Sequence, residues 1–65
     1  MTTKVQKQMT AWLKAMERAL RKSDTASVCE LRAEEFEATW PWKELDEDTF
    51  VEYECLKHRA ELHAS

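Results

Sequence analysis

The sequence predicts an all-α protein, a small three-helix bundle in which a basic amphipathic helix precedes an acidic helical hairpin. Three observations favour this fold class: the 65 residues include no glycine, they include a single proline, and their apolar residues recur at helical spacing. Asparagine is also absent, and glycine and asparagine are the residues that adopt positive φ at low cost. Tight β-hairpin turns therefore have no natural candidate in this chain.

Residues 3–22 form the clearest predicted helix. Its apolar residues share one arc of the helix surface: Val5, Met9, Trp12, Leu13, Met16 and Leu20. The opposite side is basic and carries Lys4, Lys7, Lys14, Arg18, Arg21 and Lys22, which we call the basic stripe. We expect Thr2 or Thr3 to cap this helix, because a threonine hydroxyl accepts a hydrogen bond from the first free amides.

The segment Ser23-Asp24-Thr25 separates the first helix from a second over about residues 25–39. These residue types bond nearby backbone amides and favour caps and turns, so we expect the turn to need no residue with positive φ. The predicted apolar face of the second helix holds Val28, Cys29, Ala33, Phe36 and Trp40, and its acidic face holds Glu30, Glu34 and Glu37. Pro41 disfavours helical geometry at Trp40 and should end the helix there.

Residues 47–63 form the third predicted helix, with Asp46 as its N-cap and further acids placed where they complement the helix dipole. This helix has two well-separated apolar stripes. One holds Val51, Cys55, His58 and Leu62, and the other holds Phe50, Tyr53, Leu56 and Ala60. A helix with two apolar stripes contacts two neighbours, so we expect either a small bundle formed by one chain or a unit that completes its core by dimerisation. Whether the first helix packs on the hairpin or projects from it stays open.

The composition also narrows the class of function. Without glycine, the chain has no phosphate-cradling loop, dinucleotide fingerprint, EF-hand or nucleophile elbow. A chain of this length has little room for a core and an enclosed active site together. We therefore expect one domain over residues 1–65 that is not an enzyme and binds no cofactor.

No apolar run approaches the ~20 residues that span a bilayer, and the start lacks a signal-peptide core. These features favour a cytoplasmic protein without a membrane partner.

Cys29, Cys55, His58 and His63 are the candidates for metal or redox chemistry. The Cys55-x-x-His58 spacing can chelate zinc from one helix face, but a structural site would need two further ligands in less favourable geometry. Cys29 and Cys55 lie equally far from Trp42 along the chain, which leaves a disulfide open. Because a cytosolic chain keeps its thiols reduced, we expect two ordinary buried thiols and no metal.

Charge is segregated along the chain. Residues 1–22 carry six basic residues and one acid, a net +5, and residues 23–65 carry four basic residues and twelve acids, a net −8, which together give the −3 of the whole chain. Three interpretations are open: the charges neutralise one another within the fold, the acidic surface meets a basic partner protein, or the basic stripe binds nucleic-acid phosphates.

Trp40-Pro41-Trp42 is the most unusual local feature. Tryptophan is enriched at interface hot spots, although both rings could instead fold back on the end of the bundle. An acidic cluster follows: Glu44, Asp46, Glu47, Asp48, Glu52 and Glu54. These acids either form a solvated helix start or dock on lysines and arginines of a partner. The residues that we expect to contact a partner are Trp42, Asp46, Asp48, Phe50, Glu52, Tyr53 and Leu56.

The sequence thus favours a protein–protein interaction module: a small regulator or inhibitor of the kind that bacteria, phages and plasmids encode. It would act as a homodimer and dock on a host protein that has a basic patch. The alternative is a DNA-linked regulator that contacts DNA directly through the basic stripe.

Part of the chain also resembles the Hha/YmoA family of small helical bacterial proteins. The similarity lies in Leu20-Arg21-Lys22 with Thr25 soon after, in Glu44-Leu45 before an acidic cap, and in His58-Arg59 leading to Glu61-Leu62. The chain departs from the family in the loop around Trp40-Pro41-Trp42 and needs a gap near the end of the third helix. The resemblance implies a protein that binds the nucleoid protein H-NS and lacks a strong DNA-reading element of its own. The resemblance assigns no site residues to this chain.

Overall fold

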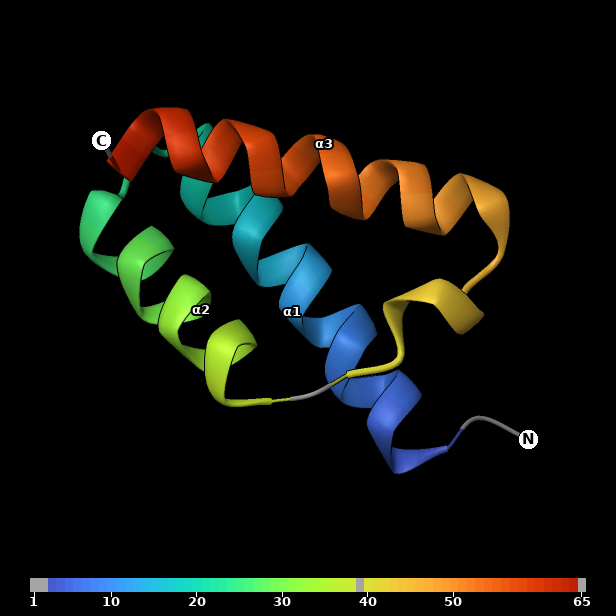
Figure 1. The fold of residues 1–65 in the computed structure, drawn as a ribbon. Helices are drawn as coiled ribbons and strands as arrows, with labels where there is room; N and C mark the ends of the chain where they lie inside the picture. The colour runs from blue at the N-terminus through green and yellow to red at the C-terminus, as the bar shows by residue number, and fades with distance from the viewer. Residues whose placement is uncertain (1–2, 39, 65) are drawn as a thin grey trace.

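The computed structural model describes residues 3–38 and 40–64, apart from the side chain of Ala64. It contains α1 (Lys4–Arg21), α2 (Thr25–Glu37), a short 3₁₀ turn η1 (Trp42–Glu44) and α3 (Glu47–Ala64), and the described residues include no strand (Figure 1). The all-helical prediction is confirmed. The second helix ends at Glu37, and the predicted end at residue 39 lies outside the described residues.

A capping box begins α1. The Thr3 hydroxyl accepts a hydrogen bond from the Gln6 amide at 3.1 Å, and the Gln6 side chain accepts one from the Thr3 amide at 3.2 Å. Both free amides are satisfied reciprocally, which fixes the first turn. Of the two caps that the sequence offered, the structure uses Thr3, while residue 2 lies outside the described residues.

The end of α1 corrects the expectation that its turn needs no positive φ. Ser23 has φ 55°, in the left-handed region. The Asp24 amide donates to the Ala19 carbonyl at 2.9 Å and the Ser23 amide donates to the Leu20 carbonyl at 3.2 Å. This pair of bonds is the Schellman motif, which requires a left-handed residue just after the helix. In a chain without glycine or asparagine, a serine takes that position.

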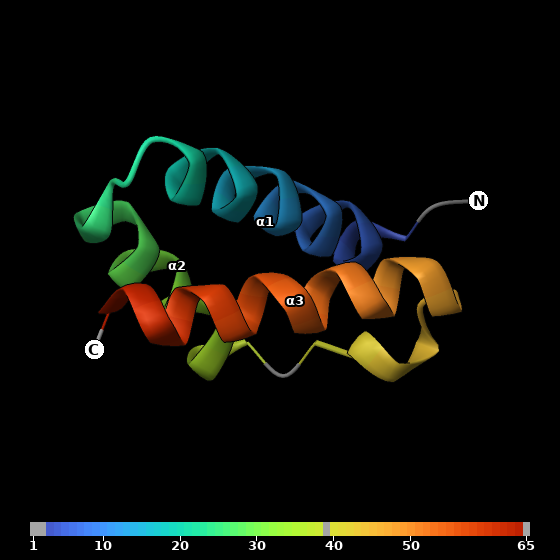
Figure 2. The ribbon, with the colours of Figure 1, turned by 90° about the horizontal axis from the view of Figure 1, so that it is seen from above.

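Helix α1 packs on both other helices, which settles what the sequence left open. Viewed from above, α1 and α3 run in roughly the same direction, and α2 runs back at an angle to both and crosses beneath α3 (Figure 2). The core is one cluster to which α1 contributes Met9, Trp12, Leu13, Met16, Ala19 and Leu20. The remaining core residues are Val28, Trp42, Tyr53, Leu56 and Ala60. The first helix is therefore the main apolar element of the fold.

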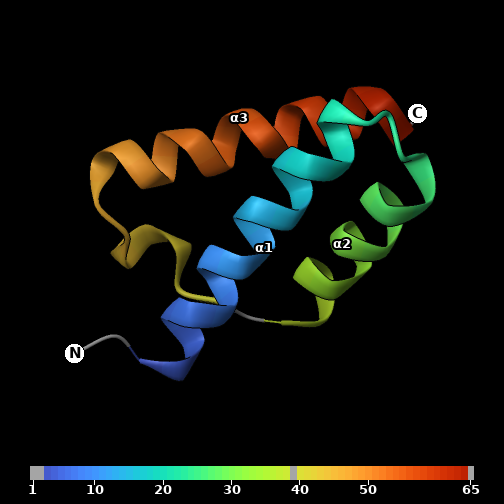
Figure 3. The same ribbon diagram turned by 180° about the vertical axis from the view of Figure 1, so that it is seen from behind.

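Helices α2 and α3 form an open V. They meet where α2 begins and α3 ends, where Thr25 Oγ1 lies 3.3 Å from His63 Nε2. They diverge toward the segment that connects them, and residues 40–46 cross the gap (Figures 1 and 3). The predicted hairpin is thus splayed at its connected end.

Helix α2 faces the core with only one edge of its predicted apolar face, the edge that carries Val28, and is rotated toward Leu31. Val28 is fully buried and Leu31 packs against the core, whereas Cys29, Ala33 and Phe36 are exposed. One physical reason is a bond from α1: Trp12 Nε1–H donates to the Leu31 carbonyl at 2.7 Å. This bond holds the side of α2 that carries Leu31 against α1, so Phe36 points away and is 85% exposed.

The two apolar stripes of α3 separate as the pattern predicts. Tyr53, Leu56 and Ala60 are buried in the core. Val51 and Leu62 are 52% and 66% exposed on the outer side.

Candidate protein-binding surface

An aromatic cluster joins the loop to the core of the bundle. The Trp42 ring stacks on Tyr53 with 3.9 Å between centroids and 7° between planes. Trp12 meets Trp42 edge-on at 5.3 Å, and Trp40 meets Trp42 at 5.4 Å. Edge-on pairs at such distances are a favourable arrangement of aromatic rings. The cluster therefore fixes the loop onto α1 and α3.

The cluster buries part of the predicted partner site. Trp42, Tyr53 and Leu56 lie in the core, which leaves them little surface for a partner. The reason is that the tryptophan rings fold back onto Trp12, the arrangement that the sequence left as the alternative. The other four predicted residues remain accessible: Asp46, Asp48 and Glu52 are exposed, and Phe50 is half-buried against the cluster.

The acidic cluster is solvent-exposed. Glu44 lies in η1, Asp46 directly precedes α3, and the other four acids lie in the first turns of that helix. All six side chains are exposed. In the described part of the chain the single ion pair is Arg21–Glu17, with 2.9 Å between Nη2 and Oε1, so no acid of the cluster is neutralised by direct contact.

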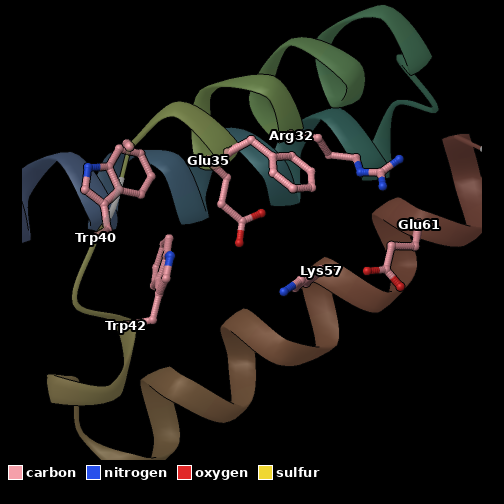
Figure 4. A pocket seen from close by; sticks show the side chains of 8 residues that line it. Arg32, Glu35, Trp40, Trp42, Lys57 and Glu61 are labelled. Carbon is pink, nitrogen blue, oxygen red and sulfur yellow. The ribbon is translucent and has the colours of Figure 1, made fainter.

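Two hollows lie on either side of the Trp40–Trp42 segment. The first, which we call the interhelix groove, has a volume of about 280 Å³ between α2 and α3 (Figure 4). Its lining residues are Arg32, Glu35, Phe36, Ala38, Trp40, Trp42, Lys57 and Glu61. The second, of about 430 Å³, is lined by Trp40, Pro41, Trp42, Lys43, Glu44, Phe50, Tyr53, Glu54 and Lys57. Phe50 therefore lines the same hollow as Glu44 and Glu54 of the acidic cluster.

Glu35 is a structural residue that the sequence interpretation missed. The Tyr53 hydroxyl donates a hydrogen bond to the Glu35 carboxylate, which ties α3 to α2. Burial raises the pKa of Tyr53 above its ordinary value of 10.0, and the Glu35 bond adds to the shift. One signal was present: Glu35 lies seven residues after Val28, two helical turns along the same face.

The basic stripe is exposed along its whole length, and all six of its side chains reach solvent. Arg18 and Lys22 line a shallow hollow together with Asp24, Glu30 and Glu34. Opposite charges therefore face each other between α1 and α2, as the first of the three interpretations of the charge pattern expects. Lys7 and Lys14 line a separate hollow with no acid.

Cys29 and Cys55 are both free and exposed, so the expectation of buried thiols is wrong. Both lie on the outward faces of their helices, because α2 turns its Val28 side and α3 its Tyr53 side to the core. Among residues 3–38 and 40–64, no three histidine, cysteine, aspartate or glutamate side chains gather closely enough to hold a metal ion.

Comparison of the chain with models of protein families, with curated proteins and with solved structures finds no match. Within the described ranges, no helix combines the length and apolar character needed to cross a bilayer. The function therefore has to be argued from the surfaces described above.

Proposed function

We propose that this chain is a protein–protein interaction module that docks on a basic patch of a partner protein. The docking surface consists of Asp46, Asp48 and Glu52, with Phe50 at its edge, and we call it the acidic docking surface. The observation that supports it is that these carboxylates are exposed and take part in no ion pair within the described residues. Exposed charges of one sign accelerate encounter with a partner of opposite sign and select against others.

Two perturbed groups favour a binding role over a catalytic one. The pKa of Asp24 is lowered because its carboxylate accepts hydrogen bonds from the side chain and backbone of Ser27. The pKa of Tyr53 is raised by burial and by its bond to Glu35. Catalytic groups are recognised by such shifts in a cleft that admits a substrate. Here the first group caps α2 and the second joins two helices, so both shifts serve the fold.

The role that fits such a module is that of a small regulator or inhibitor in the cytoplasm. A bundle of this size offers exposed faces on three helices and buries the rings of Trp12 and Trp42. Binding to a target does not require it to close over a substrate. The bacterial, phage or plasmid origin expected from the sequence is part of this proposal.

The test uses two matched triple variants of the tagged full chain. The first carries Asp46→Asn, Asp48→Asn and Glu52→Gln, and the second carries Glu30→Gln, Glu34→Gln and Glu37→Gln. Both remove three exposed carboxylates, but only the first removes them from the acidic docking surface. Proteins captured from a lysate of the encoding organism are identified by mass spectrometry, and the affinity of each variant for the purified partner is then measured against salt concentration.

We expect a partner with a basic surface, weakened binding by the first variant alone, and a loss of affinity with salt. Circular dichroism must show that both variants fold, because Asp46 and Asp48 also support the start of α3. Equal binding by the two variants would remove the acidic docking surface from the proposal.

The exposed basic stripe favours DNA binding as the second candidate. Titration of duplex DNA at low salt tests it, because binding to phosphates is strongest there. Replacing Lys4, Lys7 and Lys14 by glutamine should weaken any such binding. Absence of binding at low salt eliminates this candidate.

A further inference from the structure

Phe36 occupies an unusual position on this protein. It is 85% exposed, the highest value among the large hydrophobic side chains that reach solvent. It also lines the interhelix groove, which has Trp40 and Trp42 at one end (Figure 4). Energetically dominant contact residues are typically aromatic and fit into pockets of the partner. Phe36 thus combines an exposed aromatic anchor with an adjacent pocket.

The groove has room for a ring from another molecule. Its volume is about 280 Å³, and an enclosed cavity of about 150 Å³ holds a benzene molecule. In Figure 4 the Trp42 ring and the Glu35 carboxylate both point into the space between α2 and α3. A phenyl ring placed there would contact the tryptophan rings and the alkyl stem of Lys57.

The charges that line the groove are balanced. Arg32 and Lys57 are positive, Glu35 and Glu61 are negative, and each helix contributes one residue of each sign. This balance differs from the acidic docking surface, which would repel a second copy of itself. A two-fold contact places the same patch on both molecules. A patch with equal numbers of both signs can therefore pair with itself, each positive side chain lying near a negative one of the other copy.

We propose that the interhelix groove is a self-association surface whose occupant is a second copy of this chain. Phe36 of each copy inserts between α2 and α3 of the other, in an isologous dimer. This inference is independent of the proposed function, since the dimer leaves the acidic docking surface open. It also assigns the dimer contact to the groove, and not to the outer side of α3 that carries Val51.

The experiment measures molar mass by sedimentation equilibrium over a wide range of protein concentrations, with a reducing agent present. The reductant is needed because Cys29 and Cys55 are exposed and could crosslink two chains. We expect the wild type to show a monomer–dimer equilibrium. Phe36→Ser should raise the dimer dissociation constant about tenfold or more, as the loss of a hot-spot aromatic does. The variant should fold normally, because the ring is almost fully exposed.

Two further variants complete the test. Val51→Ser also removes an exposed apolar side chain, but from the outer side of α3, and should leave the dissociation constant unchanged. Lys57→Glu makes the groove acidic and should raise the constant. A wild type that stays monomeric at millimolar concentration overturns the proposal. So does a dimer that dissociates in Val51→Ser and survives in Phe36→Ser, which would place the contact on the outer side of α3.

Discussion

Helices α1 and α2 are held in the fold by different forces. Helix α1 buries six residues, whereas in α2 only Val28 is buried. Besides the contact between Thr25 and His63 at its start, α2 is positioned by two hydrogen bonds from the other helices: its Leu31 carbonyl accepts from the Trp12 indole, and its Glu35 carboxylate accepts from the Tyr53 hydroxyl. Apolar burial thus anchors one helix, and hydrogen bonds orient the other. The two helices therefore differ in how they place their aromatic residues: Trp12 of α1 is 2% exposed, and Phe36 of α2 is 85% exposed.

The largest expected effect on the free energy of unfolding comes from replacing Trp12, because its ring is buried in the core and its indole also donates the hydrogen bond to α2. Trp12→Ala should lower the free energy of unfolding by about 3–5 kcal/mol, because it removes a buried aromatic ring and leaves a cavity. In a domain with a total stability of about 5–15 kcal/mol, such a loss comes close to unfolding the chain. The urea midpoint, followed by far-ultraviolet circular dichroism, measures it.

A second variant at this position separates the ring from its hydrogen bond. Trp12→Phe keeps an aromatic ring but leaves the Leu31 carbonyl without its donor. We expect an intermediate loss. A loss below about 1 kcal/mol for Trp12→Ala would contradict the view that α1 anchors the fold.

A smaller effect is expected from the bond that orients α2. Tyr53→Phe removes the hydroxyl that donates to Glu35 and should cost about 1–3 kcal/mol, because the carboxylate loses its partner in a half-buried setting. Glu35→Gln should cost less, since the amide oxygen can still accept. If Tyr53→Phe leaves the urea midpoint unchanged, then Glu35 does not hold α2 in place.

The same bond predicts a dependence on pH. The pKa of Tyr53 is raised in the folded protein above its ordinary value of 10.0. The unfolded chain therefore loses the tyrosine proton first as pH rises, so the stability contribution is complete below pH 10 and falls above it. Unfolding midpoints between pH 8 and pH 11 should fall more steeply for the wild type than for Tyr53→Phe.

A substitution in the turn between α1 and α2 should make the protein more stable. Ser23 holds φ 55° at the Schellman position. A non-glycine residue there carries a steric cost, so Ser23→Gly should raise the free energy of unfolding by about 1 kcal/mol. Ser23→Ala is the control and should give no gain. A destabilised Ser23→Gly would show that the serine hydroxyl contributes to the turn.

The smallest effect on stability is expected from replacing the exposed Phe36. Phe36→Ser should change the unfolding free energy by no more than about 0.5 kcal/mol when measured on the monomer, because surface substitutions rarely do more. Thermal unfolding at low protein concentration measures it. A loss as large as that of Tyr53→Phe would mean that Phe36 packs within its own chain.

The pattern of α1 and α3 could be predicted because apolar burial dominates there. The apolar arc of α1 contains Met9, Trp12 and Met16, and all three are buried. The predicted range 3–22 differs from Lys4–Arg21 only by the residues at its ends. The two stripes of α3 also lie on different sides of the helix as predicted, but the buried stripe carries Tyr53 and Leu56, which the sequence had assigned to a partner.

The orientation of α2 and the left-handed turn could not be predicted in the same way. In α2 the apolar residues on the two sides of Val28 compete for the core: Cys29 and Phe36 lie on one side, and Leu31 lies on the other. The choice between them depends on contacts from α1 and α3 that are distant in sequence. Ser23 was missed because serine rarely adopts positive φ. The burial of Trp42 depends on Trp12, thirty residues earlier in the chain.

The indole cluster has a consequence for spectroscopy. All three tryptophans of the chain take part in it, and Trp40 lies 6.3 Å from Trp12 and 5.4 Å from Trp42 between ring centroids. Indoles at such distances couple electronically, so the folded protein should show an exciton couplet in the aromatic circular dichroism and rapid energy migration among the rings. The contributions that involve Trp12 are lost from both signals when the loop leaves α1. The chain therefore carries an intrinsic optical probe of loop closure that needs no label.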